Sequence, residues 1–177
     1  MNKLNLIKQL ENYHSFDVFE QQHFNEVVDF INTNDDLFSK NNLKGHITTS
    51  AVVIDNAHAN ILLIWHEKLK RWLQPGGHVE AEVDETLAKA ATRELMEETG
   101  LDVNDFSLVS ETTFDLDVHQ IPKRKSEQEH RHYDFRFLFK CHHINELSTQ
   151  YKWVPIREVI EFKDPSLSRF AEKIIVL

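Results

Sequence analysis

Residues 76–101 have the sequence GGHVEAEVDETLAKAATRELMEETGL, and this stretch decides the fold. Its apolar residues recur at helical spacing, which predicts a helix that begins at Asp84 or Glu85 and runs to about Thr99. Gly100 follows at the position where a helix often ends in the left-handed conformation. The double glycine at the start is typical of a tight turn. The stretch therefore predicts a glycine loop followed by an amphipathic helix.

Three carboxylates share one sector of this predicted helix. Glu94, Glu97 and Glu98 stand at positions i, i+3 and i+4, beside the apolar stripe that faces the core. Like charges at these spacings repel one another, by a few tenths of a kcal/mol per pair on an exposed helix. A hard divalent cation such as Mg²⁺ offsets this cost, because it prefers oxygen ligands. The alternative for an isolated run of acids is a solvated acidic face.

The neighbouring residues favour the metal site, since the ordered set resembles the Nudix box, the signature of the Nudix hydrolases. That pattern is Gly, five residues, Glu, seven residues, then Arg-Glu-apolar-x-Glu-Glu-x-Gly-apolar. From Glu85 to Leu101 the chain fits it without a mismatch, whereas seven residues separate Gly77 from Glu85. The resemblance extends to the flanking strands and leaves only residues 1 to about 40 outside it.

The resemblance implies an α/β fold, a Nudix-type α/β/α sandwich with a mixed sheet. It also implies a Mg²⁺-dependent hydrolase, with Mn²⁺ as a possible substitute, in which water attacks a phosphoanhydride of a nucleoside diphosphate linked to another group. The implied metal ligands are the side chains of Glu94, Glu97 and Glu98 and the carbonyl of Gly77.

Further roles follow from the same resemblance. Arg93 would pair with Glu85, hold the loop against the helix and orient the metal ligands without binding the metal itself. The proton of the attacking water would pass to one carboxylate, either Glu98 or the loop acid Glu127. These two alternatives stay open at this point.

A second polar segment lies around residues 127–136. In a strand, His130, His132 and Asp134 share one face, opposite a row of aromatic residues. They are candidates for a polar wall of the substrate cleft, and Arg71 is a further candidate for binding phosphate. The alternative is an antiparallel strand with one wet face. A zinc site at these histidines has neither a cysteine nor a helical histidine pair to support it.

The rest of the chain predicts one compact unit with an N-terminal addition. Apolar residues at helical spacing predict two amphipathic helices in a helical extension over residues 1–42, packed on the main domain or on a partner subunit. Residues 43–177 form the predicted catalytic domain, with strands at 46–54, 59–65, 106–109, 112–118, 133–139 and 151–155 and helices at 156–162 and 166–175. The phenylalanine-rich N-terminal helices are a candidate homodimer surface.

Composition limits the partners. The 177 residues carry a formal net charge of −9, which disfavours nucleic acid as the main partner and favours a small nucleotide-like molecule. The single cysteine, Cys141, and the lack of a membrane-spanning apolar run lead us to expect a cytoplasmic protein without membrane association.

Two other functions remain as alternatives to the hydrolase. One is a catalytically silent protein of the same fold that senses a nucleotide. The other is a prenyl diphosphate isomerase, which needs a cysteine and a glutamate across an apolar cleft, and Cys141 alone gives it little support.

Overall fold

The structure is a computed structural model that describes residues 1–123, 128–142 and 151–177. The helices are α1 (Lys3–Leu10), α2 (Val18–Thr33), α3 (Leu87–Thr99), α4 (Ile156–Ile160) and α5 (Pro165–Ile175). The strands are β1 (Gly45–Ile54), β2 (Asn60–His66), β3 (Arg71–Leu73), β4 (Gly76–His78), β5 (Phe106–Leu108), β6 (Asp115–Ile121), β7 (His130–Cys141) and β8 (Tyr151–Pro155).

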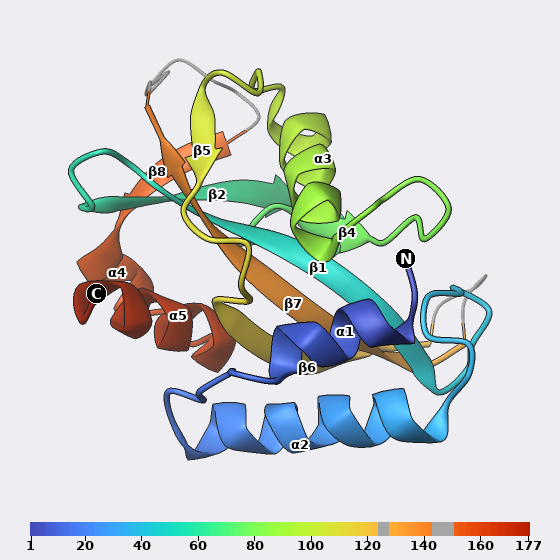
Figure 1. Ribbon diagram of the computed structural model, residues 1–177. Helices are drawn as coiled ribbons and strands as arrows, with labels where there is room; N and C mark the ends of the chain where they lie inside the picture. The colour runs from blue at the N-terminus through green and yellow to red at the C-terminus, as the bar shows by residue number, and fades with distance from the viewer. Residues whose placement is uncertain (124–127, 143–150) are drawn as a thin grey trace.

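The two longest strands, β1 and β7, form the centre of the sheet (Figure 1). They run parallel, in register from Gly45 opposite Arg131 to Ile54 opposite Lys140. The remaining pairs are antiparallel: β2 and β4 bind β1, β5 and β6 bind β7, and β3 and β8 bind β2. The sheet is therefore mixed, as predicted.

Helices cover both faces of the sheet, which gives the α/β/α sandwich (Figure 1). On one face, Ile47, Ala51 and Phe135 join the core that α1, α2 and α3 contribute to. On the other face, Val52 and Leu138 pack with the apolar residues of α4 and α5. Alternation along β1 and β7 thus supplies both cores.

The predicted loop at the double glycine, Gly76 and Gly77, is wrong. Gly76 and Gly77 belong to the short strand β4, which pairs Thr48 with His78 and Ser50 with Gly76. Three residues are too few to show a period of two, so the strand leaves no pattern in the sequence. Its consequence is that the glycines are fixed against β1 beneath α3.

The N-terminal helices form as predicted and pack on the sheet. Asp17 caps α2, because its side chain accepts a hydrogen bond from the backbone N–H of Glu20. Phe30 stacks on Tyr133 of β7 with 4.0 Å between ring centroids. Phe16 and Phe19 stay exposed. None of the described helices has the length and apolarity needed to cross a membrane.

Candidate active site

Helix α3 is fixed at both ends by the residues around it. Thr86 caps its start, with its hydroxyl oxygen accepting from the N–H of Lys89 at 3.1 Å. Asp84 and Glu85, predicted as the start of the helix, lie just outside it. Gly100 ends it with φ of 70°, as predicted.

The carboxylates on α3 have three different environments. Glu94 is half-buried, with 14% of its side chain exposed, whereas Glu97 is 58% exposed. Glu98 is half-buried and accepts a hydrogen bond from the N–H of Gly76 at 2.8 Å. The structure therefore brings Glu94 and Glu98 to β4 and leaves Glu97 beside them at the surface.

Gly77 is in close contact with one of these carboxylates. A Cβ at this position would lie 2.8 Å from Oε1 and 2.6 Å from the carboxylate carbon of Glu94. A methyl group at this position would therefore have to displace the Glu94 carboxylate. The backbone of β4 and the acids of α3 thus form one oxygen-rich patch.

Burial changes the acidity of this patch. Burial, together with the charges of Glu94 and Glu97, raises the pKa of Glu98 to about 7, against the opposing hydrogen bond from Gly76. Burial also raises the pKa of Glu94, although Arg93 acts in the opposite direction. The fold therefore holds carboxylates together in a setting that disfavours their charge, which makes the patch a candidate functional site.

Arg93 connects the helix to the loop that precedes it, but through a different acid from the one predicted. Its Nε and Nη2 donate to Asp84 at 3.2 and 2.9 Å, and Nη2 also donates to the carbonyl of His78 at 2.9 Å. Nη1 donates to Glu94 at 2.8 Å. Glu85 is exposed and pairs with Lys89 instead. The predicted Arg93–Glu85 pair is wrong. Asp84 points toward Arg93 and pairs with it, whereas Glu85 points to solvent.

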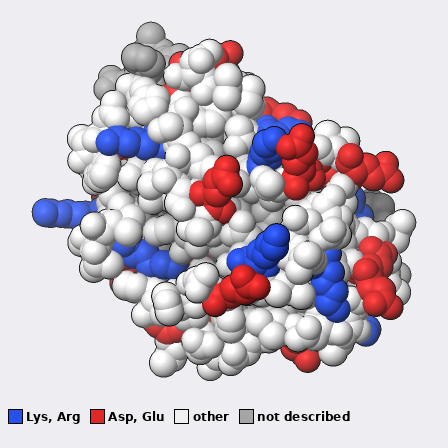
Figure 2. All heavy atoms as spheres, in the orientation of Figure 1, with Lys and Arg blue, Asp and Glu red and all other residues white. Residues whose placement is uncertain are grey.

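Charged side chains gather on the face that carries α3 and the loop after β4 (Figure 2).

The other predicted site residues are not on α3. One of them, Glu127, is not among the residues that the structure describes. Arg71 of β3 pairs with Asp164 at 2.8 Å and borders a hollow of about 550 Å³ whose walls include Trp65 and Trp72. His130 and His132 face one another in β7, with 3.2 Å between their Nε2 atoms.

Asp134 has a different environment from the one predicted. It is 2% exposed, so it is not part of a wall open to substrate. Its carboxylate accepts from Thr48 at 2.9 Å, from Ser50 at 2.8 Å and from Arg136 at 3.1 Å. Thr48 and Ser50 of β1 and Arg136 of β7 surround it, and a strand pattern alone does not reveal these neighbours.

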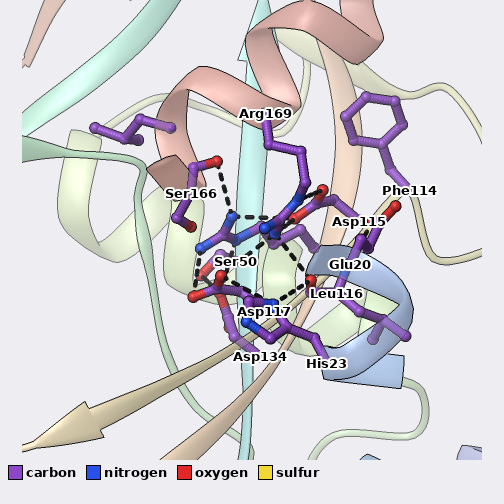
Figure 3. A network of polar contacts seen from close by, with 12 residues as sticks. Glu20, His23, Ser50, Phe114, Asp115, Leu116, Asp117, Asp134, Ser166 and Arg169 are labelled. Carbon is purple, nitrogen blue, oxygen red and sulfur yellow. Dashed lines mark hydrogen bonds and ion pairs between the residues drawn. The ribbon is translucent and has the colours of Figure 1, made fainter. Parts of the chain in front are cut away.

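Asp134 belongs to a buried ionic network that the sequence analysis missed (Figure 3). Arg136 and Arg169 each bind both Asp115 and Asp117, at distances of 2.9 to 3.3 Å. Burial acts to raise the pKa of Asp115, but the two arginines outweigh it and hold that pKa below its usual value. The sequence did contain one indication of this network: Asp115 and Asp117 are two residues apart in a predicted strand, so their side chains lie on the same face.

Solved structures share this architecture. The dihydroneopterin triphosphate pyrophosphohydrolase of Escherichia coli superposes with a TM-score of 0.59 at 18% identity, covering 80% of this chain and 98% of that one. The Ap4A hydrolase of Caenorhabditis elegans superposes with a TM-score of 0.54 at 18% identity, covering 73% and 96%. At this level of identity the likeness defines the fold class.

Sequence comparison defines the family. A model of the NUDIX domain matches residues 44–175, and the chain belongs to this family. The phosphatase NudJ of E. coli strain K12 is 46% identical over 61 residues, which make up 33% of this chain and 37% of that protein. The chain thus matches well under half the length of these curated relatives.

Proposed function

We propose that the protein is a Mg²⁺-dependent hydrolase that cleaves a phosphoanhydride bond in a nucleoside diphosphate linked to another group. The observation that carries this proposal is the contact between the α3 carboxylates and the glycine strand. Glu98 is bound to Gly76, and Glu94 fills the space beside Gly77. With Glu97 next to them, these oxygens match the donor set that a hard divalent cation takes.

The chain's own residues supply the remaining chemistry. When bound here, Mg²⁺ neutralises the diphosphate and lowers the pKa of the attacking water. Glu98 is a candidate to take up the proton, because its half-buried carboxylate lies at this patch and is held there by the N–H of Gly76. Arg93, fixed by Asp84 and the carbonyl of His78, positions Glu94.

The class of substrate follows from charge and from the family. The net charge of −9 disfavours a long polyanion and is compatible with a small diphosphate neutralised by a metal ion. The fold neighbours whose names state a substrate act on nucleotide-like molecules, Ap4A and dihydroneopterin triphosphate. The proposal therefore takes a small nucleoside diphosphate derivative as substrate and treats residues 43–177 as the catalytic domain, with residues 1–42 as its helical extension.

A turnover screen tests the proposal. Purified protein with Mg²⁺, and in parallel with Mn²⁺, is incubated with nucleoside triphosphates, dinucleoside polyphosphates, nucleotide sugars, ADP-ribose and coenzyme A, and products are identified by mass spectrometry. We expect cleavage of one class and loss of most turnover in Glu97→Gln, with Glu85→Gln as the matched control. Nucleotide binding without turnover under either metal would overturn the proposal in favour of a sensor.

A further inference from the structure

Histidines from three strands meet on the polar face of the sheet, away from the acids of α3. The register places His46 of β1 opposite His132 of β7, and His132 opposite His119 of β6. His130 lies two residues before His132 on the same face of β7. One ring nitrogen from each of His46, His130 and His132 lies within 4.8 Å of the others. We call these three residues the histidine cluster.

One member of the cluster has no hydrogen-bond partner among the described residues, and the other two are bonded to each other. His46 is 1% exposed, and neither of its ring nitrogens has a hydrogen-bond partner among the described residues. His130 donates from Nδ1 to the carbonyl of Gln128 at 2.8 Å, which leaves its Nε2 as an acceptor. The Nε2–H of His132 donates to that atom at 3.2 Å, so a metal ion bound by both rings would replace this proton. A buried nitrogen without a partner costs free energy, so a ligand that binds His46 is expected.

The spacing suits a metal ion. Zinc binds imidazole nitrogen at about 2.0–2.1 Å with tetrahedral geometry, which places two ligand nitrogens about 3.3 Å apart. The 3.2 Å between the Nε2 atoms of His130 and His132, which a hydrogen bond spans in this structure, is close to this value, and the nitrogen of His46 lies within 4.8 Å of both. The Nδ1 bond of His130 to a backbone carbonyl is also the arrangement that orients a metal-binding imidazole.

The chemistry of the cluster favours a cation over an anion. Burial disfavours a charged ring at His46, which is 1% exposed. Neutral imidazole rings bind metals, whereas only protonated rings attract phosphate. The rings of His78 and His119 lie beside the cluster, 5.5 and 5.3 Å from that of His132 between centroids.

We propose that His46, His130 and His132 bind one divalent transition-metal ion of the zinc class, at a site separate from the Glu94, Glu97 and Glu98 carboxylates. Imidazole is a ligand for zinc and its neighbours in the first transition row, whereas Mg²⁺ prefers oxygen. Three protein ligands leave a fourth position for water. This inference does not rest on the proposed hydrolase, because no residue of the cluster belongs to the α3 site.

Metal binding to the full chain tests the inference directly. Protein without an affinity tag is stripped with a chelator and dialysed against micromolar Zn²⁺, and bound zinc is measured by mass spectrometry. We expect one zinc per chain in the wild type and at least tenfold weaker binding in both His46→Gln and His132→Gln. Co²⁺ in place of zinc is expected to give visible absorption bands of a tetrahedral site, which the two variants lose.

Three controls make the outcome decisive. His14→Gln removes an exposed histidine outside the cluster and is expected to bind zinc like the wild type. Glu97→Gln is expected to keep zinc while losing Mg²⁺-dependent turnover, so that failure of one site is separable from failure of the other. Thermal melting of each stripped variant shows that it is folded. Equal zinc content in the wild type and in both cluster variants, or no zinc in any of them, would overturn the inference.

Discussion

At the scale of single residues, two adjacent acids have opposite environments. Asp84 binds Arg93 and the N–H of Glu80, whereas Glu85 is exposed beside Lys89. Because a partner that orients a metal ligand is worth about 10–100-fold in activity, we expect Asp84→Asn to lower kcat/KM at least tenfold. Glu85→Gln is expected to change it by less than about twofold. Steady-state kinetics with Mg²⁺ measure both, and the reverse order would show that the predicted Arg93–Glu85 pair forms during turnover.

Glu98 carries a pH prediction whose sign follows from its pKa. Folding raises that pKa to about 7, so the folded protein favours the protonated form. The stability this group contributes is present below its ordinary pKa of 4.5 and is lost as the pH rises through about 7. In the presence of a chelator, Glu98→Gln should therefore raise the free energy of unfolding at pH 8 by about 1–3 kcal/mol and leave it unchanged at pH 4.

Denaturant melts of the wild type and Glu98→Gln at pH 4 and pH 8 measure this difference. The same variant should lose most turnover with Mg²⁺, since the amide neither binds the cation as strongly nor accepts the proton. An equal change in stability at both pH values would mean that Glu98 does not titrate near 7 in the folded protein.

At the scale of elements, substitutions at the two glycines on either side of the α3 site are expected to have different effects, one on stability and the other on activity. Gly100 has a φ of 70° beyond the last turn, so Gly100→Ala is expected to cost about 1 kcal/mol of stability and to leave kcat close to that of the wild type. Gly77→Ala places a methyl group against the Glu94 carboxylate and is expected to weaken Mg²⁺ activation at least tenfold. Urea melts and Mg²⁺ titrations of turnover distinguish the two. Loss of activity in Gly100→Ala at unchanged stability would contradict this separation.

Whether a helix or strand can be predicted from the sequence depends on its length. Helices α2 and α3 and strands β1 and β7 run over 10 to 16 residues, and their apolar periodicity is visible in the sequence. Strands β3 and β4 have three residues each, and their pairing with β2 and β1 is what defines them. The acids on α3 were predictable from spacing within one helix. The environment of Asp84 was not, because it depends on how the loop before α3 turns.

At the scale of the whole molecule, the register between distant strands determines contacts that the sequence pattern does not predict. His46 and His132 are far apart in the chain and meet only because β1 and β7 are parallel and in register. The same holds for Asp134 and Thr48, which occupy the next row of the sheet. Periodicity predicts which face of a strand a residue occupies, but not which residue lies opposite it. Both the histidine cluster and the buried ionic network depend on that second piece of information.

The ionic network also joins the two ends of the chain, and this contact carries the last prediction. Lys173 of α5 donates to Glu20 of α2 at 2.6 Å and to the carbonyl of Phe114 at 2.6 Å, and the Glu20 carboxylate also accepts from the N–H of Leu116 at 3.1 Å. Because Glu20 is fully buried, Lys173→Met should cost about 3–5 kcal/mol of stability by leaving that carboxylate without its cation.

A double-mutant cycle separates this pairing from general damage. Glu20→Gln combined with Lys173→Met should cost less than the sum of the single changes, by at least about 1 kcal/mol, because the second change removes a charge that the first leaves unpaired. Glu26→Gln breaks the exposed pair with Arg131 and should cost less than about 1 kcal/mol. Strict additivity of the buried pair would mean that α2 and α5 are held by their apolar contacts alone, and that the N-terminal helices do not depend on this ion pair for their position on the sheet.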